Sequence, residues 1–568
     1  MRKLYKIVIT SLTASLFPFL SAFSQSLSVG SPLEDYYRRE QLFGKVDSNI
    51  SFTIRPLLTN HGLRASNIYN PDTAANNGEL RDVKSSLFAN GKGVLSLLPL
   101  RLQNQINTDH PYGWNDGAMI PAKGYQTMAS AGFYLQYGPL SIKFQPEYVY
   151  AANLPFNGFA SGHSDQDLIN YFSLHGQIDN PERYGTAAYH RAFWGQSSLR
   201  LTLGPVSVGL SNENLWWGPG IQNALVLTNN AAGFEHVTVN STYPVKTPVG
   251  FFEWQIIGGH LDNSGYPSIL QTTTSNGTLL YYPPDNDWRY FSGFNINYQP
   301  NWLNGLTLGL TRTFNAYEQD VKMHGFKAYI PFFVSYTKSA INNGNGDDFP
   351  RDEITSFYLR WLLSKANAEI YFEYGFEDNL YNLSDLLQTP EHSRAYVFGF
   401  RKFLPWGQSK DEHLLLSAEI TQTSQHTDAA IRQTGLWYYN YQLLQGHTND
   451  GQVLGAGTGP GGNLQYFDLS WVNGLKRLGV DFQRFEHDVD YSEEFFPAIN
   501  GYSRNWVDFA FGLHAEWNYN SFIFNAKIQE IKSLNYEWIL KNYNSSQYYI
   551  PNNTVYNLHA ELGITYRF

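Results

Sequence analysis

The chain has 568 residues, no cysteine and a formal net charge of −10; 16% of its residues are aromatic and only 15% are charged. The lack of cysteine excludes disulfides and thiolate metal sites, and the acidic balance disfavours nucleic acid as a partner. A mean hydropathy of −0.36 excludes a helical membrane protein. The 40 tyrosines and 14 tryptophans fit either the aromatic belts of a membrane β-barrel or a sugar-binding surface.

Residues 1–24 have the pattern of a secretory signal peptide. Basic residues at positions 2, 3 and 6 precede an apolar region, and Ala22-Phe23-Ser24 offers a small-x-small cleavage site. The alternative is an uncleaved anchor, but polar residues and Pro18 interrupt the apolar region. We therefore expect cleavage after Ser24.

Residues 25–91 are expected to form a periplasmic segment with one helix, over residues 33–43. Ser31-Pro32-Leu33-Glu34 is a capping box with proline at the first helical position, and Gly44 ends the helix. A single helix of this length is marginally stable in water, so it should dock on another surface. The periplasmic mouth of a barrel is the obvious one. Residues 51–57 predict a short extended segment.

Alternating apolar and polar residues recur from Gly93 onward, which is the side-chain period of β-strands. Outer-membrane barrels join their strands by short periplasmic turns and long external loops. The eight expected tight turns are Gly138-Pro139, Gly204-Pro205, 243–248, 300–305, 364–367, 403–411, 473–477 and 518–521. They give an even number of strands if residues 326–336 and 437–444 belong to external loops. We therefore predict an all-β fold, a transmembrane antiparallel β-barrel of about eighteen strands over residues 92–568.

The last strand, residues 557–568, illustrates the alternation. Leu558 and Ile564 share a face with Tyr566 and Phe568, whereas the opposite parity carries polar and charged residues. A soluble edge strand could show the same pattern, but the terminal aromatic residues fit an interfacial belt. A barrel in lipid must close because an open edge leaves backbone groups without hydrogen bonds. We expect this strand to pair with the first one, and Phe568 to be recognised by the barrel assembly machinery.

The inward parity of the predicted strands carries many charges. Examples are Lys143, Glu147, Arg200, Glu253, Arg360, Arg401, Asp468, Lys527, Glu561 and Arg567. A β-sandwich would have to bury these charges in its core, whereas a wide barrel can hold them in a hydrated or salt-bridged lumen. We favour structural ion pairs over a conduction pathway.

No enzyme signature is recognisable. The chain contains no G-x-S-x-G elbow, no H-E-x-x-H helix and no P-loop, and its fifteen histidines lack the spacing of metal ligands. We therefore expect a protein that is not an enzyme and that uses neither a metal nor a cofactor.

The long loops carry the candidate binding residues. Asn214, Trp216 and Trp217 stand beside a Gly-Pro-Gly bend, which favours an ordered loop. The other candidates are Tyr329 and Phe332 in an apolar wedge, Trp437, Tyr438 and Tyr439 in an aromatic run, and Tyr548 near the end of the chain. Aromatic rings and amides can stack on sugars and hydrogen-bond to them, but the same residues can pack a loop that folds inward as a plug. Both alternatives stay open at this point.

Three stretches resemble the Wzi-type capsule assembly family. They are E-N-L-W-W-G-P-G-I-Q-N-A-L-V-L-T-N-N within residues 213–239, D-G-A-M-I-P-A-K-G-Y-Q and Y-G-P-L-S-I-K-F-Q-P-E-Y-V-Y-A-A-N within residues 116–153, and the predicted helix L-E-D-Y-Y-R-R-E-Q-L-F-G. The resemblance covers nearly the whole mature chain and fits Bacteroidetes-like members. It implies an eighteen-stranded outer-membrane barrel with lectin behaviour, which attaches capsular polysaccharide through external loops. It also implies a pore blocked by loops and an N-terminal helical bundle, whereas this sequence predicts one N-terminal helix.

We therefore expect a non-enzymatic outer-membrane barrel that binds or organises capsular or other surface polysaccharide. The alternatives are a substrate-selective porin, which a charged lumen would suit, and an accessory barrel of a secretion or uptake complex. The expected partners are surface polysaccharide, outer-membrane lipid and the barrel assembly machinery, with no nucleic acid.

Overall fold

A computed structural model of the chain describes residues 25–568, with gaps at 59–61, 64–67, 72–84, 160–162, 332–349, 378–382, 408–411, 426–434, 497–504 and 540–553. The predicted signal peptide, residues 1–24, lies outside the described residues, as do Phe332 and Tyr548. In the part that is described, no helix is both long and apolar enough to cross a membrane.

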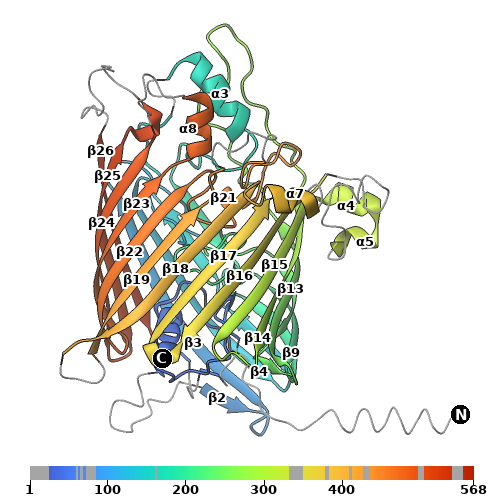
Figure 1. The fold of residues 1–568 in the computed structure, drawn as a ribbon, viewed down its shortest axis with the longest axis vertical. Coiled ribbons are helices and arrows are strands. Elements are labelled where there is room, and N and C mark those ends of the chain that lie inside the picture. The colour runs from blue at the N-terminus through green and yellow to red at the C-terminus, as the bar shows by residue number, and fades with distance from the viewer. Residues whose placement is uncertain are drawn as a thin grey trace, which may run out of the picture.

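The strands form one closed antiparallel β-barrel, so the predicted all-β barrel of eighteen strands is confirmed (Figure 1). Most barrel strands are continuous: β3 (Gly93–Asn107), β4 (Gly124–Tyr137), β9 (Val206–Ser211), β13 (Gly250–Leu261), β14 (Arg289–Pro300), β15 (Leu306–Tyr317), β16 (Asp352–Leu363), β17 (Ala368–Glu377), β18 (Arg394–Pro405), β19 (Glu412–Gln422), β22 (Asn463–Asn473), β23 (Lys476–Glu486), β24 (Val507–Tyr519), β25 (Phe522–Leu534) and β26 (Val555–Tyr566). Three are interrupted: β5 (Leu140–Phe144) with β6 (Glu147–Ala151), β7 (Tyr189–Phe193) with β8 (Ser198–Leu203), and β11 (His236–Ser241) with β12 (Val245–Lys246).

The remaining elements are short. Outside the ring lie β1 (Ile54–Arg55), β10 (Trp216–Trp217), β20 (Thr448–Asn449) and β21 (Gln452–Val453), while β2 (Ser85–Phe88) pairs with the start of β3. The helices are α2 (Pro32–Leu42), α3 (Asp165–His175), α4 (Glu318–His324), α5 (Phe326–Tyr329), α7 (Leu383–Gln388) and α8 (Val489–Phe495), with 3-10 turns η4 (Ser364–Ala366) and η5 (Tyr536–Trp538). Residues 326–329 are thus helical, and residues 437–444 contain no strand.

The ring closes between its last and first strands, as expected. In the β26–β3 ladder Ala560 lies opposite Ile106, and Thr565 lies opposite Arg101. Short turns join the strands at one end of the barrel, which we call the turn end, and the long connections gather at the other, the loop end (Figure 1). The predicted turns fall at the junctions between consecutive barrel strands, although some overlap the strand ends. Within the predicted turn 243–248, β12 pairs with β13, so that reversal lies at residues 247–249. Residues 408–411 of another turn fall outside the described part.

The two faces of the wall differ as the alternation predicts. Outward residues such as Phe511 and Leu562 are exposed, whereas inward residues such as His559 and Asp508 are buried. Each strand therefore presents an apolar face to the surroundings and a polar face to the lumen, which is the pattern that a lipid environment requires.

The N-terminal segment fills part of the lumen. Ser31 caps α2 by accepting a hydrogen bond from the Glu34 backbone N–H, so the helix begins one residue before the predicted 33–43 range. Its apolar residues join a buried cluster with the inner wall, composed of Leu27, Leu33, Tyr37, Val46, Ile50, Phe52, Leu57, Leu63, Ile68, Tyr69, Leu98, Tyr134, Leu475 and Ile523. The helix is therefore seated inside the barrel, near the turn end (Figure 1).

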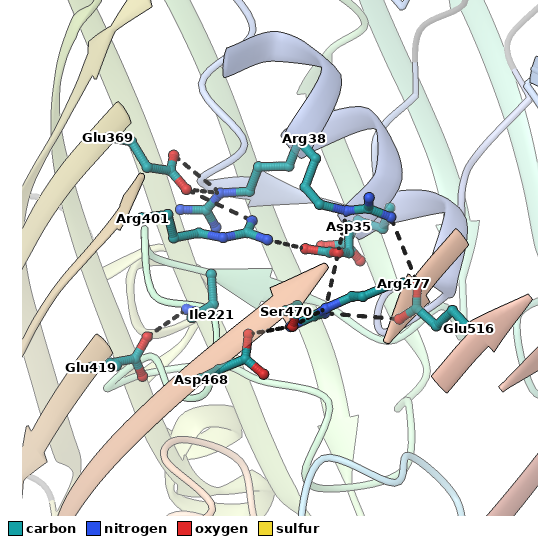
Figure 2. Close-up of polar contacts among 12 residues, drawn as sticks. Asp35, Arg38, Ile221, Glu369, Arg401, Glu419, Asp468, Ser470, Arg477 and Glu516 are labelled. Atoms are coloured by element: carbon teal, nitrogen blue, oxygen red, sulfur yellow. Dashed lines mark hydrogen bonds and ion pairs between the residues drawn. The ribbon is translucent and has the colours of Figure 1, made fainter. Parts of the chain in front are cut away.

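Charged residues of α2 pair with charges of the barrel wall (Figure 2). The Arg38 Nε donates to Glu369 Oε1 at 3.0 Å, and Glu369 also approaches Arg360 at 2.5 Å and Arg401 at 3.9 Å. The Asp35 carboxylate forms an ion pair with Arg401 at 2.7 Å, and it also pairs with Arg39 and Arg477. Several of the inward charges noted in the sequence are thus held in ion pairs.

Replacing Glu369 should weaken the barrel strongly. Glu369→Ala leaves arginines buried without their shared carboxylate, and breaking a buried charge pair in this way costs about 3–5 kcal/mol of unfolding free energy. The measurement is the temperature at which the folded form, seen by its electrophoretic mobility without boiling, is lost.

Glu494→Ala is the matched control, because Glu494 is exposed on α8. We expect its unfolding temperature to stay within a degree or two of the parent. Equal temperatures for the two variants would contradict the role given to the Glu369 cluster.

Candidate functional site

The predicted residues Asn214, Trp216 and Trp217 lie in the connection 212–235, which folds into the lumen. There β10 pairs with β1 of the N-terminal segment, with Trp217 opposite Ile54. Both tryptophans are buried, and the Trp217 Nε1 donates to Gln255 Oε1 at 2.8 Å. We call residues 26–57 and the connection 212–235 together the plug.

Carboxylates of wall and plug fix the inward connection. Glu213 is paired with Lys143 at 3.1 Å and Arg200 at 2.9 Å, and it accepts a hydrogen bond from Ser26 Oγ. On the opposite wall Glu419 accepts backbone N–H groups of Ile221, Gln222 and Asn223, the first at 2.7 Å (Figure 2). The two tryptophans therefore belong to a tightly held packing unit, which favours the plug alternative for them.

The second predicted run, Trp437 to Tyr439, lies in the connection 423–462. All three side chains are buried. The Tyr438 hydroxyl donates to the carbonyl of Leu225 in the plug at 2.8 Å, and the Trp437 Nε1 donates to the Ser393 carbonyl at 3.0 Å. The Tyr439 hydroxyl points elsewhere and donates to Asp488 at 2.8 Å. This run connects the plug to the loop end.

Tyr329 lies apart from the plug and from the run Trp437 to Tyr439. Tyr329 is half-buried on α5, where its carbonyl accepts the Tyr290 hydroxyl at 3.0 Å. Phe332 and Tyr548 lie outside the described residues. Of the seven predicted side chains that the structure describes, Tyr439 alone lines the cavity described next.

A cavity of about 290 Å³ lies at the loop end, and we call it the loop-end cavity. Its lining comes mainly from six connections far apart in the sequence. It includes Tyr112, Trp114, Tyr171, His175, Glu182, Asn230, Tyr439, His487, Asp488, Trp506, Asp508, Tyr536, Glu537 and Trp538. Ligand-binding clefts typically have this make-up, in which apolar and aromatic surface carries a few polar groups.

The aromatic rings of the cavity are held in defined orientations. Trp506 stacks on His487 with ring centroids 3.7 Å apart and an interplanar angle of 11°, and it meets Trp538 edge-on at 5.2 Å. Asp508 orients the stacked pair by accepting the Trp506 Nε1 at 2.9 Å and the His487 Nε2 at 2.8 Å. The site is therefore ordered before any ligand enters.

The cavity is also acidic, and its titratable groups are buried. Burial raises the pKa of Asp488 to about 7, and it raises the pKa of Glu537 well above its ordinary value, with the nearby charge of Glu182 adding to the effect. Burial lowers the pKa of His175 to about 3, so this imidazole is neutral at pH 7 and its 3.4 Å approach to Asp488 is not an ion pair. Among the described residues no group of three or more His, Asp or Glu side chains is placed to hold a metal.

The sequence does not single out Trp506, Tyr536 and Trp538 as binding residues. Trp506 directly precedes β24, and the other two lie in the 3-10 turn η5, one residue after the end of β25. An aromatic residue at the loop end of a strand is also what a membrane belt requires, so the residue type alone does not separate the two roles. Whether such a residue lines a binding site or belongs to a membrane belt depends on how the loops fold.

The chain was compared with known families and structures. The family model described as capsule assembly protein Wzi matches residues 104–534. The fold is similar to that of Wzi from Escherichia coli, described as an outer-membrane protein involved in group 1 capsule assembly and a carbohydrate-binding β-barrel. That match has a TM-score of 0.59 and 13% identity, and it covers 96% of this chain and 100% of that one. At this identity the likeness shows the fold.

A weaker match is OccAB1 from Acinetobacter baumannii, with a TM-score of 0.37 and 8% identity over 86% of this chain and 99% of that one. The comparison with curated proteins finds no match.

Helix α8 should lose protection as pH rises. Burial raises the pKa of Asp488 to about 7 and that of Asp490 to about 8, while an unfolded aspartate titrates near 4. Between about pH 4 and pH 8 the folded loop holds protons that the opened loop has lost, so its stability falls as pH increases. Hydrogen exchange of the α8 amides, corrected for intrinsic rates, should show less protection at pH 8 than at pH 5.

Asp490→Asn should reduce this pH dependence, because the amide cannot ionise and its oxygen can still accept the Gln425 N–H. Asp285→Asn, an exposed change in the connection between β13 and β14, should preserve it. Equal protection of the parent at the two pH values would refute the linkage.

Proposed function

The chain belongs to the Wzi capsule assembly family, and from this premise we propose that it binds capsular or other surface polysaccharide at the loop end of its barrel. The protein is an outer-membrane β-barrel, and in barrels of this class the long loops face the outside of the cell. The observation that carries the proposal is the loop-end cavity, which is lined by ordered aromatic rings at the end of the barrel where the long loops lie.

The cavity has the groups that a sugar residue needs. One face of Trp506 stacks on His487 and one face of Tyr171 stacks on His175. Both rings are half-buried, so their exposed parts offer apolar area for a sugar ring. The buried carboxyl groups of Asp488 and Glu537 offer hydrogen-bond partners for hydroxyls. Orientation by Asp508 lowers the entropic cost of binding, because Trp506 is already fixed. Tyr439 joins this set through its hydrogen bond to Asp488.

The predicted residues of the plug and of the connection 423–462 have a different proposed role, Tyr439 excepted. Asn214, Trp216, Trp217, Trp437 and Tyr438 are buried, so we assign them to the packing that supports the cavity from below. Tyr329, Phe332 and Tyr548 stay candidates for contacts with longer stretches of the polymer.

We propose that the protein acts by binding alone. Two carboxyl groups such as Glu182 and Glu537 in a sugar-sized cavity also suit glycoside hydrolysis, so the binding experiment includes the chain length of the recovered polysaccharide. Unchanged length supports binding, and shortening supports hydrolysis.

Removing the ring of Trp506 should weaken binding of the native surface polysaccharide. Trp506→Ala takes away the stacking face and should raise the dissociation constant at least about tenfold, the size expected for an aromatic anchor. Titration calorimetry on the purified full chain in detergent measures it. Trp302→Ala is the matched control, because Trp302 is 77% exposed in the turn between β14 and β15 at the opposite end.

We expect the control to bind like the parent. If Trp506→Ala folds, as judged by its electrophoretic mobility, and still binds with parental affinity, the cavity is not the polysaccharide site. A parallel loss in both variants would have the same meaning.

The occupied lumen disfavours the porin alternative and gives a second prediction. Purified protein in planar bilayers should show no steady conductance, whereas deletion of residues 214–233, the core of the inward connection, should open a pore. Ready conductance of the intact chain would favour a substrate-selective porin over the plugged barrel.

A further inference from the structure

Two short helices lie on the outer side of the barrel wall. Helices α4 and α5 follow β15, and Figure 1 shows them beside the ring of strands, away from its lumen. Their residues Val321 and Ala328 are buried in a cluster with Ala316 of β15, and Tyr290 of β14 packs against that cluster. Tyr290 and Ala316 are opposite each other in the β14–β15 ladder. We call residues 318–330 the outer helical segment.

The segment is attached at the level of the membrane boundary. Asn315 donates to the carbonyl of the buried Gly446 at 3.1 Å on the lumen side, so the next residue, Ala316, faces outward. Strand β15 has 12 residues. At about 3.3 Å per residue and a tilt of about 40°, such a strand rises about 30 Å, little more than the apolar band of ~25 Å in barrels of this class. Ala316 is next to last in the strand, so it lies close to where the apolar band ends and the lipid headgroups begin.

The side of the segment that faces away from the wall combines apolar and basic groups. Residues 322–327, K-M-H-G-F-K, are all exposed and include no acidic residue. Met323 is 73% and Phe326 79% exposed. Lys322 pairs with Glu318 at 3.1 Å, but the lysine side chain is 71% exposed and the glutamate side chain only 13%. The segment therefore presents positive charge, together with two large apolar side chains, to its surroundings.

We propose that the outer helical segment anchors the loop end of the barrel to the outer leaflet of the membrane. Met323 and Phe326 enter the headgroup boundary. Lys322 and Lys327 bind the phosphate groups of anionic lipid there. Apolar side chains interleaved with lysines are the composition of interfacial elements, which bury the former at the edge of the acyl region and attract anionic lipid with the latter.

The size of the surface favours lipid over a protein partner. Met323, Phe326 and Ile330 together offer on the order of 400 Å² of apolar area, less than the ~600 Å² that each partner buries in the smallest stable protein–protein interfaces. Lipid needs no fixed complementary shape, so a small surface is sufficient. None of residues 318–330 lines the loop-end cavity, so this inference is independent of the proposed polysaccharide site.

The experiment uses the full chain, which has no cysteine. Met323→Cys therefore gives a single site for an environment-sensitive nitrobenzoxadiazole label, and the labelled protein is reconstituted in vesicles of equal parts phosphatidylcholine and phosphatidylglycerol. We expect emission at a shorter wavelength than in water, and quenching by lipid that carries a nitroxide at its headgroup. Asn276→Cys is the matched control, because Asn276 is exposed in the connection between β13 and β14. Its label should emit as in water and escape quenching.

The role of the lysines is tested in the labelled Met323→Cys protein. The readout is the quenching by nitroxide-labelled phosphatidylglycerol divided by the quenching by nitroxide-labelled phosphatidylcholine at the same content. One lysine at an anionic surface changes the local lipid preference by up to about fivefold, so the ratio should exceed one and Lys327→Gln should lower it by up to this factor. Lys246→Gln, an exposed change at the turn end, should leave the ratio at its starting value.

Emission as in water from the label at position 323, in a protein whose electrophoretic mobility shows that it is folded, overturns the inference. Emission at a shorter wavelength that rises with the protein-to-lipid ratio and resists the lipid quencher also overturns it, because a second copy then covers the segment. A quenching ratio of one, or a ratio that Lys327→Gln leaves unchanged, refutes the contact with anionic lipid.

Discussion

Charge balance inside the lumen is the constraint on which the rest of the structure depends. The wall contributes Arg360, Arg401 and Glu369, and α2 contributes Asp35 and Arg38; the two sets neutralise each other across the lumen. A buried charge that loses its partner costs several kcal/mol, so neither the wall nor the helix is stable alone in this geometry. The N-terminal segment is thus a structural complement of the barrel rather than an appendage in its mouth.

The plug in turn supports the loop-end cavity through one loop. Neighbouring residues of that loop face in opposite directions: the Tyr438 hydroxyl reaches the Leu225 carbonyl in the plug, and the Tyr439 hydroxyl reaches Asp488 in the cavity. The Tyr438 backbone N–H is also anchored on Glu377 of the wall. Because the loop is fixed at each of these points, the shape of the cavity depends on contacts deep in the lumen. Rigid support of this kind favours binding by a preformed site.

Local pattern was sufficient to predict the barrel but not the site. The alternation of strands such as β26 and the Gly-Pro turns after β4 and β8 determine parity and strand number, and both are properties of adjacent residues. The interruptions between β5 and β6 and between β7 and β8 contain Pro146 and Gly195, residue types that mark irregularities in strands, but the prediction did not use them. Burial of Trp216 and Trp437 depends on whether a loop turns inward, and the cavity brings together rings from five connections. No short stretch of sequence encodes those long-range contacts. Most of the predicted residues that the structure describes therefore pack inside the protein instead of lining the loop-end cavity.

The closing seam of the barrel also has a consequence for how long the folded state lasts. Asn107 on β3 and His559 on β26 meet across 452 residues of sequence, a pairing that carries a high entropic cost to form. Beside this seam Arg567 donates to the carbonyl of Tyr69, which follows the plug in the chain. Opening the seam therefore breaks the strand ladder and releases a hold on the N-terminal segment in the same event. Two sets of contacts that must fail together raise the barrier to unfolding, so the lifetime of this barrel is a matter of kinetics as much as of equilibrium.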